Sequence, residues 1–155
     1  MKNSKQITDM ETIFAKAKDI FKREIKFRAW EPELNCMFRY NYSMPDLLIS
    51  FDGKIFQQTF TEDGEPTKEL IRDPQPILMQ YTGLKDKNDE EIYESDILTW
   101  PNAAIPDKEI VFFEDGAFCV RSSSDGYKHF LGKDKLNICC KKIGNIYENP
   151  ELLEK

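Results

Sequence analysis

The chain has 155 residues, of which 40% are hydrophobic and 32% charged, a balance typical of a folded globular protein rather than a disordered chain. Its formal net charge of −6 produces a field that repels phosphate backbones, which disfavours nonspecific binding to nucleic acid. No apolar run is long enough to cross a membrane and no signal peptide is recognisable, so we expect a protein of the reducing cytoplasm.

Residues 8–22 have the apolar periodicity of an amphipathic helix, and Thr8 with Glu11 forms a capping box at its start. A lone amphipathic helix of this length is marginal in water, so we expect its apolar stripe to be buried. Self-association is the favoured way to bury it, and packing on the rest of the chain is the alternative. The candidate interaction surface on this helix consists of Met10, Ile13, Phe14, Ala17 and Phe21.

From Glu24 the apolar period changes to two, which predicts a half-buried strand. Alternate positions of this strand would face opposite sides, with Ile25, Phe27 and Ala29 on one side and Lys26, Arg28 and Trp30 on the other. Two Asp-Gly pairs, Asp52-Gly53 and Asp115-Gly116, predict hairpin turns between apolar runs. The acidic stretch 61–76 predicts an exposed connection with one helical turn around Lys68 to Arg72.

Four further features follow in the second half of the chain. An alternating run from Glu91 to Trp100 predicts one continuous strand. Gly144 predicts a bulge or bend in the final strand, and Pro150 predicts the start of a terminal turn of helix. The adjacent Cys139 and Cys140 would point to opposite faces of a strand, which suits neither a shared metal ion nor a mutual disulfide.

These elements predict a mainly β (α+β) fold. It would consist of an N-terminal amphipathic helix followed by two β lobes, the C-terminal one a small Src-homology-3-like barrel from about Ile77 onward. In domain terms, residues 1–22 would be a helical extension and residues 23–155 the main domain, with a soft boundary within 61–76.

Three blocks of the sequence resemble the signature blocks of the YopX family, a group of phage and prophage proteins. They are "REIKFRAW" (Arg23 to Trp30), "YTGLKDKNDEEIYESDIL" (Tyr81 to Leu98) and "IGNIYENPELL" (Ile143 to Leu153). The family pattern usually has Asn-Gly where this chain has Asn88-Asp89, and Gly where it has Ser95. The resemblance implies a mainly β protein of the bacterial cytoplasm that is encoded by a mobile element. It implies no reaction, so no catalytic residue is carried over.

Two carboxylates of the second block, Glu94 and Asp96, would lie on the same face of the predicted strand, about 7 Å apart at Cα. At that separation they could share a cation or raise the pKa of one of the pair. Alternatively the stretch is architectural, because Ser95 permits a tight bend and Asp96 can accept backbone N–H bonds. We favour the architectural interpretation.

Side chains suited to catalysis are sparse. The one histidine, His129, lies in a polar stretch typical of a surface or hairpin position, with no nucleophile motif near it. The glycines lack the spacing of a phosphate-binding loop, and no cysteines or histidines have the spacing of zinc ligands. We therefore predict that the protein is not an enzyme and binds no cofactor or metal.

The favoured function is a non-enzymatic accessory protein that acts as a protein-interaction module, through self-association, with a host or phage protein as a further partner. The alternative is a small-barrel protein that binds nucleic acid through a basic face. That face would consist of Lys128, Lys133, Lys135, Lys141 and Lys142. An enzyme that depends on the carboxylates of Glu94 and Asp96, or on a metal held by them, is the least favoured function.

Overall fold

The computed structural model of the chain describes residues 24–39, 47–50, 52–71, 75–101, 107–132 and 139–154. In this part of the chain the secondary structure is almost entirely β and forms three antiparallel sheets. A short 3-10 helix, η2 (Pro150–Leu153), follows the last strand, and Pro150 lies in its first turn as the sequence predicts. Among the described residues, no helix has the length and hydropathy needed to cross a membrane.

The first sheet has four strands in the order β2 (Cys36–Arg39), β1 (Phe27–Glu31), β6 (Ile77–Lys85) and β7 (Glu91–Tyr93). Its core contains Trp30, Met37 and Met79, with Tyr93 and Tyr147 packed against them. The prediction of a half-buried first strand is wrong, because Arg28, Ala29 and Trp30 are all buried. Arg28 can be buried because its charge is paired with the carboxylate of Asp96, which lies on a strand of the second sheet.

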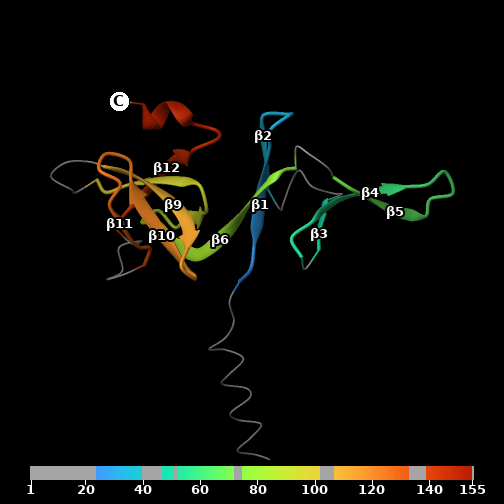
Figure 1. The fold of residues 1–155 in the computed structure, drawn as a ribbon, viewed down its shortest axis with the longest axis horizontal. Helices are drawn as coiled ribbons and strands as arrows, with labels where there is room; N and C mark the ends of the chain where they lie inside the picture. Colours follow the sequence, from blue (N-terminus) through green and yellow to red (C-terminus); the bar gives the residue numbers. More distant parts are fainter. Residues whose placement is uncertain are drawn as a thin grey trace, which may run out of the picture.

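The second sheet has five strands in the order β11 (Lys128–Phe130), β10 (Ala117–Ser122), β9 (Lys108–Glu114), β8 (Asp96–Thr99) and β12 (Lys141–Asn145). It curls into a half-barrel, which β6 enters from the first sheet (Figure 1). The fully buried core of this half-barrel comprises Ile92, Leu98, Val111, Val120 and Cys140. One of these residues, Ile92, comes from β7, so the first sheet supplies part of the second core.

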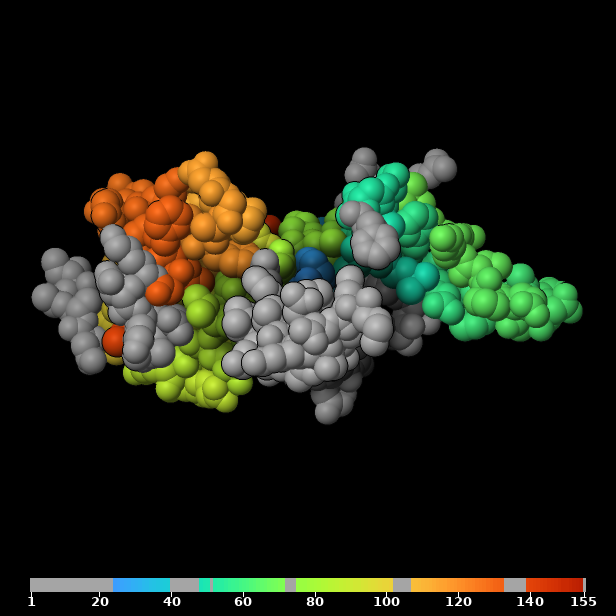
Figure 2. All heavy atoms as spheres, turned by 90° about the horizontal axis from the view of Figure 1, so that it is seen from below, coloured from blue at the N-terminus to red at the C-terminus, as the bar shows by residue number. Residues whose placement is uncertain are grey.

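The third sheet has the order β3 (Leu47–Ile49), β4 (Ile55–Phe60) and β5 (Pro66–Leu70), and we call it the arm. In the described residues none of its strands pairs with a strand of the other sheets, and the β4–β5 hairpin projects from the body of the protein (Figures 1 and 2). The exposure predicted for residues 61–76 is confirmed over Thr61 to Leu70, but the predicted helical turn is wrong, because Pro66–Leu70 is a strand that pairs with β4 along its whole length.

Local turn signals are confirmed where they involve glycine. Asp115 and Gly116 both have positive φ, at 51° and 79°, in the tight turn between β9 and β10. Asp52-Gly53 lies in the turn between β3 and β4. Gly144 follows a shift of register between β12 and β8, which confirms the bulge. A Cβ added at Gly144 would lie 2.6 Å from Asn149 Oδ1, so the absence of a side chain lets the C-terminal turn pack on β12.

The predicted fold class needs correction in three respects. The α+β class is wrong for the described residues, which contain no α-helix. The expected two β lobes are three sheets, and the expected barrel is a half-barrel, because β11 and β12 end the five-strand order and are not paired with each other. The proposed N-terminal helix, with its surface of Met10, Ile13, Phe14, Ala17 and Phe21, lies outside the described residues.

Candidate functional site

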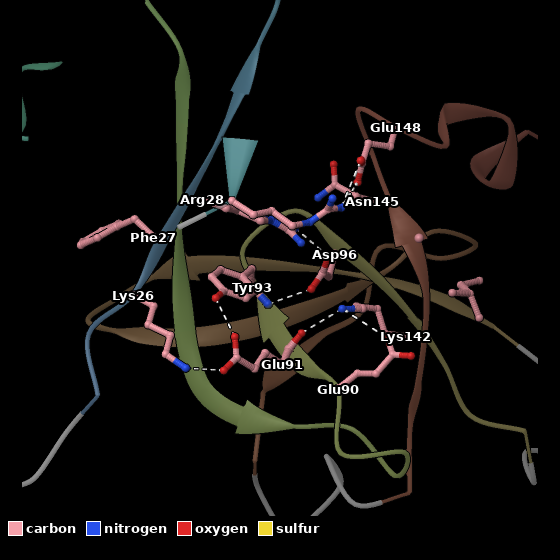
Figure 3. A pocket seen from close by; sticks show the side chains of 13 residues that line it. Lys26, Phe27, Arg28, Glu90, Glu91, Tyr93, Asp96, Lys142, Asn145 and Glu148 are labelled. Atoms are coloured by element: carbon pink, nitrogen blue, oxygen red, sulfur yellow. Dashed lines mark hydrogen bonds and ion pairs between the residues drawn. The ribbon is translucent and has the colours of Figure 1, made fainter. Parts of the chain in front are cut away.

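A cleft of about 830 Å³ lies between the first sheet and the C-terminal strand (Figure 3). Its walls come from five parts of the chain: the start of β1 with the residue before it, the end of β2, strand β7 with the residue before it, Asp96 at the start of β8, and β12 with the turn that follows it. The lining is strongly charged, and each of its four cations is paired with a carboxylate. The pairs are Lys26 with Glu91, Arg28 with Asp96, Arg39 with Glu148, and Lys142 with Glu90.

The Arg28–Asp96 pair is the buried part of the cleft. Arg28 Nη2 lies 2.7 Å from Asp96 Oδ1 and also donates to the backbone carbonyl of Glu94 at 3.1 Å. The guanidinium lies over the Tyr93 ring, with its carbon 4.8 Å from the ring centre. Asp96 Oδ2 accepts the backbone N–H of Tyr93 at 2.8 Å, so both oxygens of the carboxylate are used. Burial raises the pKa of Asp96, and the charge of Arg28 and the Tyr93 N–H oppose that rise.

Glu91 is the centre of the more open side of the cleft. It accepts from Lys26 Nζ and, at 2.8 Å, from the hydroxyl of Tyr93. Burial alone would raise the pKa of Glu91, but these two hydrogen bonds outweigh it and lower the pKa. Burial raises the pKa of Tyr93 and the bond to Glu91 raises it further. The hydrogen bond to Glu91 raises the pKa of Lys26. These three groups therefore keep fixed protonation states near neutral pH.

Asp86 connects the turn before this cleft to the last strand. One of its carboxylate oxygens accepts the backbone N–H groups of Asn88 and Glu90, and the other accepts the N–H of Lys142 at 2.9 Å. Burial works to raise the pKa of Asp86, but the three backbone donors outweigh it and lower the pKa. Sequence reasoning missed this residue, although an Asp two residues before an Asn in a turn is a recognisable signal for such a bond.

The two carboxylates proposed as an acidic site have different partners. The chain is not one strand from Glu91 to Trp100, because Ser95 has a φ of 67° and separates β7 from β8. Asp96 is bonded to Arg28, whereas Glu94 Oε2 accepts the backbone N–H of Gln80 at 2.8 Å. Within the described ranges, no three Asp, Glu, His or Cys side chains are grouped so that they could hold a metal ion.

The lysines proposed as a basic face are divided between two places. Lys128 is on β11 and pairs with Glu114 and Asp115, whereas Lys142 is on β12 and lines the cleft. Those two strands are the opposite edges of the five-stranded sheet. Lys141 is exposed on β12, and Lys133 and Lys135 lie outside the described residues.

His129 is less exposed than the sequence predicts, with 20% of its side chain accessible. Its Nε2 lies 3.5 Å from Oε2 of Glu109, and its ring packs edge-on against Trp100. Burial, followed by the charges of Asp107 and Asp125, raises the pKa of Glu109 to about 7. Sequence reasoning missed this pair because β9 and β11 are not adjacent in the sheet and no local spacing relates them.

Comparison with known proteins identifies relatives of the same fold. The profile of the YopX protein family matches residues 26–154. Protein yopX from Bacillus subtilis superposes with a TM-score of 0.56 at 25% identity, covering 83% of this chain and 97% of that one. Protein EF1440 from Enterococcus faecalis gives a TM-score of 0.53 at 29% identity, covering 84% and 99%. No curated protein matches. Because the family match spans most of the chain, this protein belongs to the YopX family.

Proposed function

We propose that this YopX family member is a non-enzymatic accessory protein that acts by binding another protein. The observation that carries the proposal is the arm, which projects from the body of the protein and exposes large apolar side chains. Phe60 is 61% exposed, Leu48 43% and Leu70 40%. Apolar side chains gathered on one exposed surface are typical of an interaction site.

The chemistry of the cleft supports binding rather than catalysis. A general acid or base works best when its pKa lies near the working pH. In the cleft, however, the pKa of Tyr93 and of Lys26 is raised and that of Glu91 is lowered, so that each moves away from neutrality. The ion pairs instead join β1, β7 and the C-terminal part of the chain. We assign the cleft a structural role in holding the body that carries the arm.

A protein partner is also favoured over nucleic acid. The net charge of −6 opposes contact with phosphates, and Lys128 and Lys142 of the suggested basic face already have carboxylate partners. We propose a host or phage protein as the partner and the bacterial cytoplasm as the compartment. Both solved relatives come from bacteria, which supports that setting.

The experiment is purification of the tagged full-length chain from its bacterial host after mild cross-linking, with and without nuclease treatment. We expect one or a few proteins to co-purify in near-stoichiometric amount and to remain after nuclease treatment. A protein that purifies alone, or that releases only nucleic acid, would contradict the proposed function.

A further inference from the structure

The arm has one apolar face and one largely polar face. Cross-strand partners in an antiparallel sheet lie on the same face. The register pairs Phe56 with both Leu48 and Leu70, and pairs Phe60 with Pro66. Alternate residues of β4 share a face, so these side chains lie on one face, which we call the apolar face, with the polar pair Gln58–Lys68 between Phe56 and Phe60. It consists of Leu48, Phe56, Phe60, Pro66 and Leu70.

The opposite face of the arm has the character of an ordinary solvated surface toward its tip. Thr59 and Thr67 are partners there and their hydroxyl groups are hydrogen-bonded, and Gln57 is opposite Glu69. Its apolar residue on β4, Ile55, is buried at the base of the arm. Ile49, the partner of Ile55, is 43% exposed on this opposite face near the base, so it is toward the tip that the exposed apolar side chains are confined to one face.

Negative charge is concentrated at the tip of the arm, beside Phe60 and Pro66. Residues 52–71 contain five carboxylates and two lysines, so this segment of 20 residues has a net charge of −3, half of the −6 of the whole chain. Three of the carboxylates, Glu62, Asp63 and Glu65, are exposed in the turn between β4 and β5. A surface that fits this arm therefore presents apolar side chains flanked by lysine or arginine.

The same features argue against a second copy of the chain as the occupant. Two arms placed together would each carry a net charge of −3 and would repel. The free edge of β5 begins with Pro66, which has no N–H to donate, and carries Lys68 at its centre. Proline and lysine on an edge strand oppose pairing between identical edges.

We infer that the apolar face of the arm docks a partner protein that presents apolar side chains flanked by lysines or arginines. This inference rests on the proposed function, because it names the surface and the chemistry of the protein contact. The exposed aromatic Phe60, near the acidic turn, is the expected centre of affinity.

A random peptide library displayed on phage provides a defined probe, selected against the full-length protein. We expect enriched peptides to combine apolar residues with lysine or arginine. Their affinity should fall about tenfold or more, which corresponds to about 1.4 kcal/mol or more, for the variant Phe60→Ser/Leu70→Ser, since this variant removes an aromatic anchor of the contact. The variant Glu62→Lys/Asp63→Lys should also bind more weakly and with less dependence on salt. All four positions are exposed, so the variants should retain their fold.

The matched control is Leu34→Ser/Glu33→Lys, which changes an exposed leucine and an exposed carboxylate in the turn between β1 and β2. It should bind the selected peptides as the unaltered protein does. Peptides without basic residues, or peptides that bind the Phe60→Ser/Leu70→Ser variant equally well, would overturn the inference. A dimer detected by light scattering that becomes a monomer in that variant would also overturn it.

The two proposals fail in different ways. If the arm is not the surface, the Phe60→Ser/Leu70→Ser variant will still co-purify with the same protein from the host, and only this inference is lost. If no protein co-purifies with the unaltered chain, the proposed function is lost as well.

Discussion

Two residues of this chain have left-handed backbone conformations where the family pattern usually has glycine. Asp89 and Ser95 both have a φ of 67°. In that conformation a residue with a Cβ is less favourable than glycine by roughly 1–2 kcal/mol. Glycine loses more conformational entropy on folding, which offsets about 0.5–1 kcal/mol of that advantage. We therefore expect Asp89→Gly and Ser95→Gly each to raise the free energy of unfolding by about 0.5–1 kcal/mol in urea titrations. Alanine at the same positions is the control and should give no gain.

The buried carboxyl group of Glu109 gives a second prediction at the residue scale, which concerns how the stability of the protein depends on pH. Burial raises its pKa from 4.5 to about 7 in the folded protein. As pH rises from about 4.5 to about 7, the unfolded chain releases this proton before the folded chain does, so Glu109 lowers stability with increasing pH. The variant Glu109→Gln should be more stable than the unaltered protein at pH 8, by up to about 3 kcal/mol, and nearly equal to it at pH 4.5.

Urea titrations at several pH values would measure this difference. The charged groups that face Glu109 are His129, Asp107 and Asp125, and they are unchanged in the variant. The exposed Glu65 on the arm provides the control, because Glu65→Gln should alter stability little at either pH. An equal gain for Glu109→Gln at both pH values would show that packing, and not ionisation, is responsible.

At the scale of elements, one ion pair joins β1 to β8 and therefore the first sheet to the second. Asp96→Asn would leave the Arg28 guanidinium buried without a countercharge, which should cost about 3–5 kcal/mol of unfolding free energy. Glu94→Gln should cost less than about 1 kcal/mol, because an amide oxygen can still accept the N–H of Gln80. If Asp96→Asn and Glu94→Gln lost similar amounts of stability in thermal or urea unfolding, the Arg28–Asp96 ion pair would not be the contact that joins the two sheets.

Turns and bulges could be predicted from the sequence where a residue at that position requires them. The glycine turns at Gly53 and Gly116 and the bulge at Gly144 require a backbone conformation or a close approach that the sequence indicates directly. Strand β5 could not be predicted, because "PTKEL" has little β propensity and acquires its conformation from pairing with β4. The bend at Ser95 and the backbone N–H accepted by Asp96 agree with the favoured architectural interpretation, although the alternation of residues on either side predicted one continuous strand.

At the scale of the whole molecule, the cleft lies beyond local sequence reasoning. The partners in its ion pairs are far apart in the chain: Lys26 and Glu91 are 65 positions apart, and Arg39 and Glu148 are 109 positions apart. The blocks that resemble the family contain most of the cleft residues, but spacing within a block does not indicate which block contacts which. Only the order of the strands in the first sheet brings β1 next to β6, and β6 next to β7.

The sheets should also differ in local stability. The arm exposes every residue of β5, whereas β8 has three consecutive buried residues. Segments with few buried apolar contacts open at lower free energy than core strands. In native-state hydrogen exchange we therefore expect the amides of β4 and β5 to exchange well before those of β8 and β9. Simultaneous exchange of all four strands would show that the arm unfolds only with the whole protein.

The pairing of early residues with late ones in the cleft has a consequence for synthesis. On the ribosome, Arg28 is made 68 residues before Asp96, and Trp30 is made long before Tyr147, the ring that stacks on it. Until Asp96 and Tyr147 emerge, Arg28 and Trp30 of the nascent chain lack the partners against which they are buried in the folded protein. Contacts of such high sequence separation slow folding. The strands of the first sheet are complete once Tyr93 is made, but its core is covered only as translation of the domain ends, and until then the growing chain exposes the kind of apolar surface that chaperones bind.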